Sequence, residues 1–367
     1  MLVARTMSEE HIEFLEEPEP RPAPGEALLR VHTVTLCGTD LHIWQDDYAT
    51  ELPIVQGHEF SAVVEALPAG PAVDAEGTPL DVGNAVVVSP MIWCGSCHAC
   101  TIGRTNACRR MSVLGCYQDG AFAERLTTTP DKLYRLPAGV DPSTAALAEP
   151  ISISLQAVSR GRPVAGERAV VLGCGPIGLF ATRRLKDLGV EVLAVDTLAS
   201  RTRLAEQFGA DHTLVLDPAV PFPTAEHAEL IEHWTHGDGP SLVLEATGMP
   251  ASLNNAPRIV STAGRVVCVG ISDKQLGLSM RLLPVKEIDL IGSRNSCNLL
   301  GESLRFLAAH DELVESLVTH RFPFEKLDHA MATLADRTQT VGKVAVEMPA
   351  ATVRPLATAA TATEESA

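Results

Sequence analysis

Residues 168–196 read RAVVLGCGPIGLFATRRLKDLGVEVLAVD, and their pattern sets the architecture of the second half of the chain. Residues 168–172 are mostly apolar and predict a buried strand. A segment with helical spacing runs from Pro176, which suits a first helical turn, to Leu188, just before Gly189. Residues 190–195 are apolar again and predict a second strand. This alternation predicts a doubly wound parallel sheet with helices on its faces.

The turn in this segment has the pattern G-x-G-x-x-G. Gly173 permits a tight turn, Gly175 lets the backbone approach a pyrophosphate, and Gly178 lets helix and strand pack closely. Asp196 closes the second strand 18 residues after Gly178, where a carboxylate can accept hydrogen bonds from the ribose hydroxyls of NAD. It would repel the 2′-phosphate of NADP, although Arg201 can either stack on adenine or offer a charge to NADP. We therefore predict an NAD site, with NADP as the alternative.

The rest of the chain predicts further elements on both sides of this segment. Before residue 150 the chain is rich in Gly, Pro and short β-branched runs, which predicts a β-rich domain with strands at 27–34, 61–66 and 85–89. Further buried strands are predicted at 241–245, 265–269 and 288–291. From about residue 349 the chain is rich in Ala and Thr without periodicity, which predicts a disordered tail.

Length and composition exclude several classes of protein. A chain of 367 residues with 46% hydrophobic and 20% charged residues predicts two globular domains. A net charge of −17 argues against binding to nucleic acid or to an anionic membrane. No apolar run is long enough to span a bilayer or to act as a secretory signal. We therefore expect a cytoplasmic protein whose cysteines are reduced.

Four of the nine cysteines form one cluster, Cys94, Cys97, Cys100 and Cys108, with the spacing C-x2-C-x2-C-x7-C. Four thiolates at this spacing can close a tetrahedral zinc site with no open position, so the site would be structural. A [4Fe–4S] cluster is one alternative. In the ferredoxin motif, however, three residues separate the third and fourth cysteines and a proline follows the fourth, whereas here seven residues separate them and Arg109 follows. A nucleic-acid-binding zinc ribbon is another, which the acidic charge disfavours.

A second group of candidate metal ligands lies near the N-terminus, in the segments CGTDLH, residues 37–42, and GHE, residues 57–59. Cys37 and His58 are good zinc ligands, and Glu59 or water can complete an open site. Each residue also has an ordinary interpretation, because a single Cys is usually a small buried hydrophobe and a single His is usually just hydrogen-bonded.

These segments, the four-cysteine lobe, the GxGxxG turn and Ala148-Glu149-Pro150 resemble the zinc-containing medium-chain dehydrogenases, a family that includes alcohol, sorbitol and L-threonine dehydrogenases. The resemblance covers about Glu17 to Val346. It implies a GroES-like, β-rich catalytic domain interrupted by a Rossmann domain, with the active site in the cleft. The bounds we predict are 1–154 for the catalytic domain, 155–296 for the Rossmann domain, 297–348 for the return to the catalytic domain and 349–367 for the tail.

The resemblance also implies roles for individual residues. Cys37, His58 and either Glu59 or Glu149 would hold a catalytic zinc, with Asp40 supporting a ligand. The bound zinc would lower the pKa of a substrate hydroxyl, and hydride would pass to NAD. Thr39 would accept the hydroxyl proton and His42 would pass it on; for His42, a structural role or a ribose contact is the alternative. The cofactor residues implied are Gly173, Gly175, Pro176, Ile177, Gly178, Asp196, Arg201, Val269, Gly270 and Ile271.

The sequence says less about the substrate. CGTDLH resembles the threonine branch, but the Gly-Asn pair usual there after the proline is absent after Pro150, and residues 149–158 look more like the polyol branch. Residues 292–296, GSRNS, resemble dehydrogenases of hexonates, and Arg294 could grip a carboxylate or phosphate, touch the cofactor or face solvent. We predict a polyhydroxylated substrate: a polyol, sugar acid or cyclitol, or the matching ketone.

Two alternatives to this function stay open. One is L-threonine 3-dehydrogenase-like oxidation of an amino alcohol. The other is a redox-inactive NAD-binding protein, which would have no chemical need for an open zinc site. The resemblance further implies a homodimer or homotetramer assembled through the edge strands of Rossmann domains.

Overall fold

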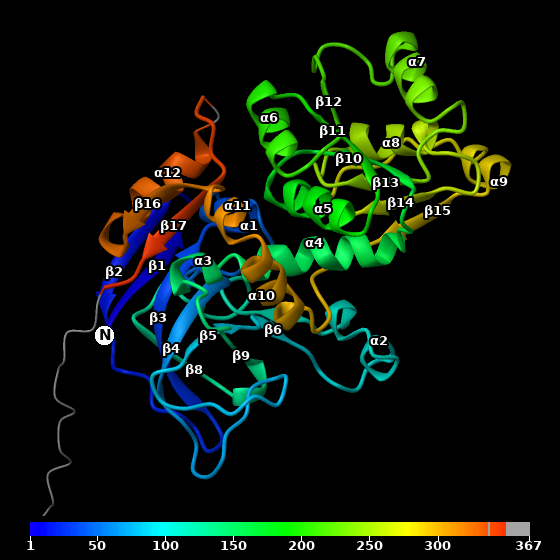
Figure 1. The fold of residues 1–367 in the computed structure, drawn as a ribbon. Coiled ribbons are helices and arrows are strands. Elements are labelled where there is room, and N and C mark those ends of the chain that lie inside the picture. The colour runs from blue at the N-terminus through cyan, green and yellow to red at the C-terminus, as the bar shows by residue number, and fades with distance from the viewer. Residues whose placement is uncertain (337, 350–367) are drawn as a thin grey trace, which may run out of the picture.

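The computed structural model describes residues 1–336 and 338–349, which form two large sheets (Figure 1). One sheet has seven strands and is mostly antiparallel, and the other has six strands and is parallel throughout. The predicted fold class, a β-rich domain joined to a doubly wound α/β domain, is confirmed. No helix in the described part of the chain has the length and apolar character needed to cross a bilayer. The predicted disordered tail lies almost entirely outside the described residues.

The parallel sheet has the strand order β12-β11-β10-β13-β14-β15. The order reverses between β10 and β13, and in such sheets a dinucleotide binds at this point, beyond the carboxyl ends of the strands. Five of the six strands of this sheet were predicted from the sequence, and each lies within two residues of its expected bounds; β12 was not predicted. The strands are β10 (Arg168–Leu172), β11 (Glu191–Asp196), β12 (His212–Val215), β13 (Leu242–Glu245), β14 (Arg265–Cys268) and β15 (Asp289–Gly292).

The seven-stranded sheet combines both ends of the chain. Its path is β16-β17-β3-β4-β5-β9, with β8 also paired to β3. The last strand of the described residues therefore lies beside one of the first, and β17 pairs antiparallel with β3. The strands are β3 (Ala27–Thr35), β4 (Glu59–Ala66), β5 (Ala85–Val88), β8 (Arg125–Thr128), β9 (Leu133–Arg135), β16 (Val318–Pro323) and β17 (Lys343–Glu347); β1 (Leu2–Ser8) and β2 (His11–Glu16) form a hairpin, and β6 (Met91–Ile92) pairs with β7 (Ser112–Val113).

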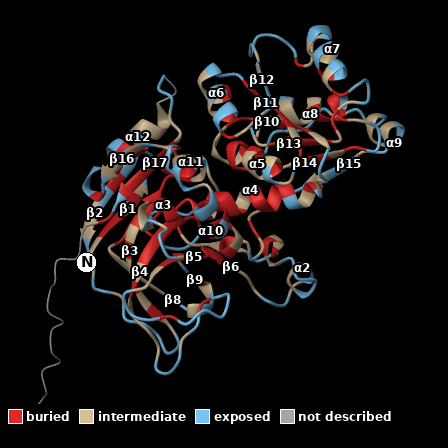
Figure 2. Ribbon diagram, viewed as in Figure 1, coloured by how far each residue is buried: buried red, intermediate tan, exposed pale blue. Residues whose placement is uncertain are grey.

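Both faces of the central strands of the parallel sheet, β10, β11 and β13, are buried (Figure 2). Successive side chains of a strand point to opposite faces, so Ala169 and Val171 join one core cluster while Val170 and Leu172 join another. The first cluster includes residues of α4 and α5, and the second includes residues of α7 and α8. Helices on both faces explain why these strands read as continuous apolar runs.

One helix joins the two halves of the molecule. Helix α4 contacts β4 of the mixed sheet and β13, β14 and β15 of the parallel sheet. The predicted domain boundary at residues 154–155 falls inside this helix. The helices are α1 (Gly38–Trp44), α2 (His98–Thr101), α3 (Pro142–Ala145), α4 (Ala148–Gly161), α5 (Pro176–Asp187), α6 (Ala199–Gln207), α7 (Ala225–Trp234), α8 (Pro250–Ile259), α9 (Leu282–Lys286), α10 (Leu300–Ala309), α11 (Asp311–Glu315) and α12 (Leu327–Ala335), with 3-10 turns at Thr105–Ala107, Pro130–Lys132 and Phe324–Lys326.

Candidate functional site

The end of β3 and the start of β4 bring together a sulfur, a nitrogen and an oxygen donor. The two strands pair antiparallel, with Thr35 opposite Glu59. Cys37 lies just past β3, at the N-cap of α1, and His58 lies just before β4. The potential ligand atoms of Cys37, His58 and Glu59 therefore lie within 4.8 Å of one another. This donor set fits Zn²⁺, which takes thiolate, imidazole and carboxylate ligands and keeps an open position in catalytic sites.

Two side chains face the Nδ1 atom of His58. Asp40 Oδ1 lies 3.6 Å from it and Cys116 Sγ lies 3.8 Å from it. Asp40 is fully buried, and its other oxygen accepts a hydrogen bond of 2.8 Å from the backbone N–H of Cys37. Burial lowers the pKa of His58, but the neighbouring Cys116 and Asp40 raise the pKa by more. With Nδ1 facing these groups, Nε2 is the ring nitrogen available to a metal, and Asp40 contacts both candidate ligands, as supporting residues of metal sites do.

Glu59 belongs to a buried ion pair that the sequence did not reveal. The ammonium of Lys343, on β17, contacts both carboxylate oxygens, with 2.6 Å between Nζ and Oε1. The hydroxyl of Thr35 donates to Oε2. The side chains of Lys343 and Glu59 are 5% and 1% exposed. Burial lowers the pKa of Lys343, but Glu59 together with Cys37 and Glu149 raises it by more. Three hydrogen bonds therefore compete with a metal for the lone pairs of Glu59.

Glu149 lies near this cluster, in the first turn of α4. Burial raises the pKa of Glu149 to about 7; the charge of His58 opposes this rise and that of Glu59 adds to it. The group of mutually close donors contains Cys37, His58 and Glu59 but not Glu149. The structure thus brings three of the four expected ligands together, and leaves Glu149 as a second carboxylate within electrostatic reach of them.

The two residues expected to carry a proton lie on α1. Thr39 and His42 are three positions apart, so they are neighbours on one face of the helix. The Nδ1 atom of His42 lies 2.6 Å from Oδ1 of Asp47, and both side chains are more than half exposed. Asp47 was not recognised from the sequence, because the residue lies beyond the helix and becomes a neighbour of His42 only when the chain turns back after Trp44.

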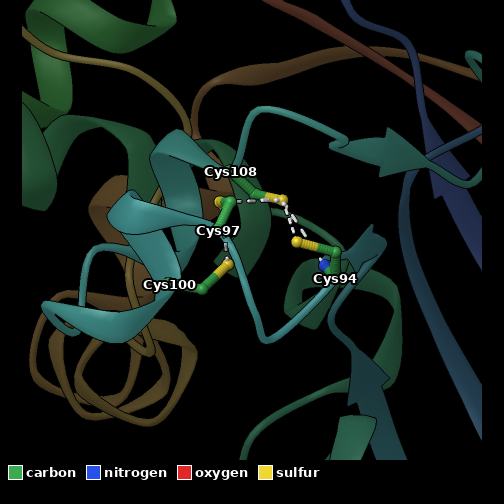
Figure 3. A group of neighbouring side chains, drawn as sticks. All are labelled: Cys94, Cys97, Cys100 and Cys108. Atoms are coloured by element: carbon green, nitrogen blue, oxygen red, sulfur yellow. Dashed lines mark hydrogen bonds between the residues drawn. The ribbon is translucent and has the colours of Figure 1, made fainter.

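The four predicted cysteines converge in a lobe around α2 (Figure 3). The Sγ–Sγ distances are 3.6 Å for Cys97–Cys100, 3.9 Å for Cys97–Cys108 and 3.5 Å for Cys94–Cys108. These distances are too long for disulfides. They match the edge of a ZnS₄ tetrahedron, which is about 3.8 Å for Zn–S bonds of about 2.3 Å. Hydrogen bonds from the backbone of Ser96 and from Arg110 lower the pKa of Cys94 to about 5, which favours the thiolate that a metal needs.

The glycine-rich turn lies between β10 and α5. Gly173 has φ of +97°, which favours glycine, and a Cβ on Gly178 would lie 1.8 Å from Gly173 O. By contrast, a Cβ on Gly175 would meet nothing within 4 Å, so this glycine borders open space. Pro176 and Ile177 begin α5, with Gly175 as the N-cap residue. A turn that is tight at two glycines and open at the middle one fits a pyrophosphate.

Asp196 lies at the end of β11, where the fingerprint requires an acidic residue. Its oxygens accept backbone hydrogen bonds from Cys174 N at 2.8 Å and Leu198 N at 3.0 Å. Each oxygen keeps a further lone pair, so the carboxylate can also accept from ribose hydroxyls. Arg201 follows in the first turn of α6 and is half-buried.

The remaining predicted residues follow β14 and β15. Val269, Gly270 and Ile271 come directly after β14, and Ile271 is 77% exposed. Arg294 is exposed, and its carbonyl accepts a hydrogen bond of 2.7 Å from Asn106 of the four-cysteine lobe. Its guanidinium has no hydrogen-bond or ion-pair partner among the residues that the structure describes.

Comparison with known proteins agrees with this geometry. The family model of the alcohol dehydrogenase GroES-like domain matches residues 23–138, and that of the zinc-binding dehydrogenases matches residues 176–309. The chain is 35% identical to L-galactonate-5-dehydrogenase of Escherichia coli K12, covering 84% of this chain and 87% of the relative. It is 33% identical to 2-dehydro-3-deoxy-L-galactonate 5-dehydrogenase of Pseudoalteromonas atlantica, covering 80% and 83%. A protein of E. coli CFT073 described as a short chain alcohol dehydrogenase, solved with NADH, superimposes with a TM-score of 0.84, at 28% identity and coverage of 95% and 99%.

Proposed function

This chain belongs to the zinc-containing medium-chain dehydrogenases, and we propose that it transfers hydride between NAD and a secondary hydroxyl of a polyol, sugar acid or cyclitol. The observation that carries the proposal is the close donor set of Cys37, His58 and Glu59. It occurs in a molecule that also has an open glycine turn at the switch point of a parallel sheet. An open metal site and a dinucleotide site are the two parts that alcohol oxidation of this kind requires.

Two zinc ions per chain would account for the two donor sets. Cys94, Cys97, Cys100 and Cys108 would hold a structural ion in a closed site. Cys37 and His58 would hold the catalytic ion, with Glu59, Glu149 or water completing it. The ion pair with Lys343 disfavours Glu59 as a permanent ligand, because binding would cost its hydrogen bonds. We therefore favour Glu149 or water at rest.

The residues around the site have distinct roles in the reaction. Bound zinc would lower the pKa of the substrate hydroxyl, and NAD would take up the hydride. Thr39 accepts the hydroxyl proton and His42 passes it to solvent. Asp47 accepts a hydrogen bond from Nδ1 of His42, which fixes the ring and leaves Nε2 free for the transfer. Asp40 keeps the ring of His58 in the orientation that a metal requires.

Asp196 supports NAD over NADP. Its carboxylate ends β11 and carries a negative charge where the 2′-phosphate of NADP would lie. Arg201, the nearest candidate for binding that phosphate, follows in α6. Measured Michaelis constants that favour NADP strongly would contradict this assignment.

The substrate class rests on sequence features and on relatives. The names of two relatives specify galactonate-type sugar acids. Arg294 is exposed and unpaired among the described residues, so it is available to a carboxylate of such a substrate. The CGTDLH segment favours a second candidate, oxidation of a 3-hydroxy amino acid such as L-threonine, although the Gly-Asn pair after Pro150 is missing.

A substrate screen tests the proposal. The zinc-loaded protein is assayed for NADH formation at mildly alkaline pH with polyols, hexonates, cyclitols, aminocyclitols and L-threonine. We expect turnover with a polyhydroxylated compound and none after Cys37→Ser. Turnover of L-threonine alone would favour the second candidate. No turnover with any alcohol, despite bound zinc and bound NAD, would favour a redox-inactive NAD-binding protein instead.

A further inference from the structure

Cys116 is a buried thiol that the proposed mechanism does not use. Four of the other cysteines form the lobe, and Cys37 belongs to the candidate catalytic metal site. Cys116 is in neither donor group, but it is 4% exposed and its Sγ lies 3.8 Å from Nδ1 of His58. A buried cysteine is usually a small apolar residue that fills space. Here the thiol also has a polar neighbour, and that neighbour is a candidate metal ligand.

The Nδ1 atom of His58 needs a hydrogen-bond acceptor when a metal is bound. A histidine that binds a metal through Nε2 carries its proton on Nδ1. Asp40 Oδ1 lies 3.6 Å from Nδ1, which is too long for an N–H···O hydrogen bond, and this buried oxygen has no hydrogen-bond partner among the described residues. Sulfur is a larger atom and a weak acceptor, and at 3.8 Å the thiol of Cys116 is within hydrogen-bond range. The thiol is therefore the acceptor that Nδ1 reaches in this structure.

The loop that carries Cys116 packs directly against the residue before His58. A Cβ on Gly115 would lie 2.6 Å from the carbonyl carbon of Gly57, and a Cβ on Gly120 would lie 2.4 Å from the carbonyl oxygen of Gly57. The two backbones thus approach so closely that neither glycine of the loop has room for a methyl group. Cys116 follows directly after Gly115, so this contact fixes the backbone from which the thiol projects.

Cys116 is also held on its other sides. Its carbonyl accepts a hydrogen bond of 2.7 Å from the hydroxyl of Thr50. Its side chain belongs to a small core cluster with Ile43 and Ile54. With the backbone bonded and apolar neighbours around the side chain, the sulfur has little freedom to move away from His58.

Asp40, the other group that faces Nδ1, is fixed by a different segment. Its Oδ2 accepts from the backbone N–H of Cys37 at 2.8 Å, and its carbonyl accepts from Nε2 of Gln56 at 2.8 Å. Asp40 is therefore tied to the start of α1, whereas Cys116 is tied to the segment before β4. The imidazole thus has two neighbours at Nδ1 that the fold positions independently.

We propose that Cys116 is a positioning residue of the candidate catalytic metal site, whose thiol accepts a hydrogen bond from Nδ1 of His58 and so keeps Nε2 available to the metal. The inference deepens the proposed zinc-dependent function and rests on it. Partners of this kind fix the orientation of a ligating imidazole, and their loss costs about 10- to 100-fold in metal affinity. Because a thiol is a weak acceptor, we expect a loss of about tenfold.

Zinc binding to the full-length protein tests this inference without turnover. The dissociation constant of each bound zinc is measured by competition with a chromogenic chelator, and Cys37→Ser identifies the ion of the catalytic site. Serine and alanine are of similar size, but only serine keeps an acceptor. Cys116→Ala should therefore bind the catalytic ion about tenfold more weakly than the wild type, and Cys116→Ser should bind it more tightly than Cys116→Ala. Cys268→Ala is the control, because Cys268 ends β14 and is in neither donor group, so both affinities should stay unchanged.

The comparison of serine with alanine separates hydrogen bonding from packing. Equal affinities in these two variants, or wild-type affinity in Cys116→Ala, would overturn the inference, because the thiol would then only fill space. If Cys116→Ala does not fold, Cys116→Val takes its place, since valine fills the volume but cannot accept a hydrogen bond, and it should show the same loss. A wild type that binds only one zinc ion per chain would contradict the proposed function as well. Two ions bound equally well by the wild type and every Cys116 variant would contradict only the inference.

Discussion

Lys343 and Glu59 form an ion pair between residues 284 positions apart in the chain, beside the candidate catalytic metal site. Both side chains are almost fully buried, so each loses its hydration and depends on the other. The pair also determines how available the Glu59 carboxylate is to a metal. A single lysine therefore contributes to both the stability of the catalytic half and the composition of the metal site.

Lys343→Met should destabilise the protein strongly, because it leaves the Glu59 charge buried without a partner. We expect a loss of about 3–5 kcal/mol in the free energy of unfolding, measured by denaturant titration. Lys186→Met is the matched control, since it breaks a partly exposed pair with Asp211 and should cost about 1 kcal/mol or less. Equal losses in the two variants would contradict a special role for the buried pair.

His42→Ala should lower kcat by about 100-fold near neutral pH, with a smaller loss at alkaline pH, because the substrate proton must then leave directly to solvent. The measurement is the pH profile of kcat with a substrate found in the screen. His11→Ala is the control, because His11 has the same 55% exposure as His42 and also faces a carboxylate. An unchanged kcat and pH profile in His42→Ala would exclude the relay.

At the scale of single elements, the four-cysteine lobe is a short segment that the proposed structural zinc would hold together. Its helix α2 has four residues with none buried, too few to be stable alone. The lobe also contacts the loop after β15 through Asn106 and Arg294. Metal binding would therefore hold both the helix and this contact in place.

Cys100→Ser should remove one of two zinc ions per chain and lower the melting temperature, because three thiolates cannot close the site. Metal content is measured by mass spectrometry alongside thermal unfolding. Cys297→Ser is the control, since this thiol contacts the lobe but is not among its four clustered cysteines, and should leave both ions bound. Iron and sulfide in the purified wild type would overturn the assignment of zinc.

The glycine turn allows two substitutions with opposite expected effects. Gly178→Ala places a methyl group 1.8 Å from Gly173 O, so it should displace α5 and lower the melting temperature. Gly175→Ala faces open space, so the melting temperature should hold while the affinity for NADH falls, because the methyl group occupies the place of the pyrophosphate. Thermal unfolding and NADH fluorescence titration measure both effects. Unchanged NADH affinity in Gly175→Ala would argue that no cofactor lies on this turn.

At the scale of the whole molecule, the sequence predicted features that depend on local pattern. The strand at 168–172 and the helix from Pro176 matched because apolar runs, a glycine turn and a proline each act within a few residues. The cysteine spacing likewise predicted the lobe, because short links limit where the thiolates can lie. Each of these signals lies within a single short segment of the sequence.

Contacts between distant segments were not predictable in this way. Lys343 begins an apolar segment, and nothing near it indicates that Glu59 is its partner. Asp47 becomes a neighbour of His42 only through the turn after α1. These residues act through tertiary structure, which no short pattern records.

Among the described residues the parallel sheet ends at β15 (Figure 1). Several apolar side chains at and near this edge are exposed. Leu290 on β15 is 40% exposed, and Val285 and Met280 nearby in the chain are 62% and 85% exposed. An unpaired edge strand with such neighbours favours pairing with another copy of the chain. The edge is therefore compatible with the homodimer or homotetramer that the family resemblance implies, which stays a prediction.

Leu290→Lys should convert that assembly to smaller species, because two lysines would meet at the paired edges and apolar area would be lost. Size-exclusion chromatography with light scattering measures the mass of the wild type and of the variant. Leu230→Lys on α7 is the matched control, since Leu230 is 43% exposed but lies away from the sheet edge, and it should leave the mass unchanged. A wild type that is monomeric at micromolar concentration would show that the β15 edge is not an interface. An oligomer of unchanged mass in Leu290→Lys would place the interface on another surface.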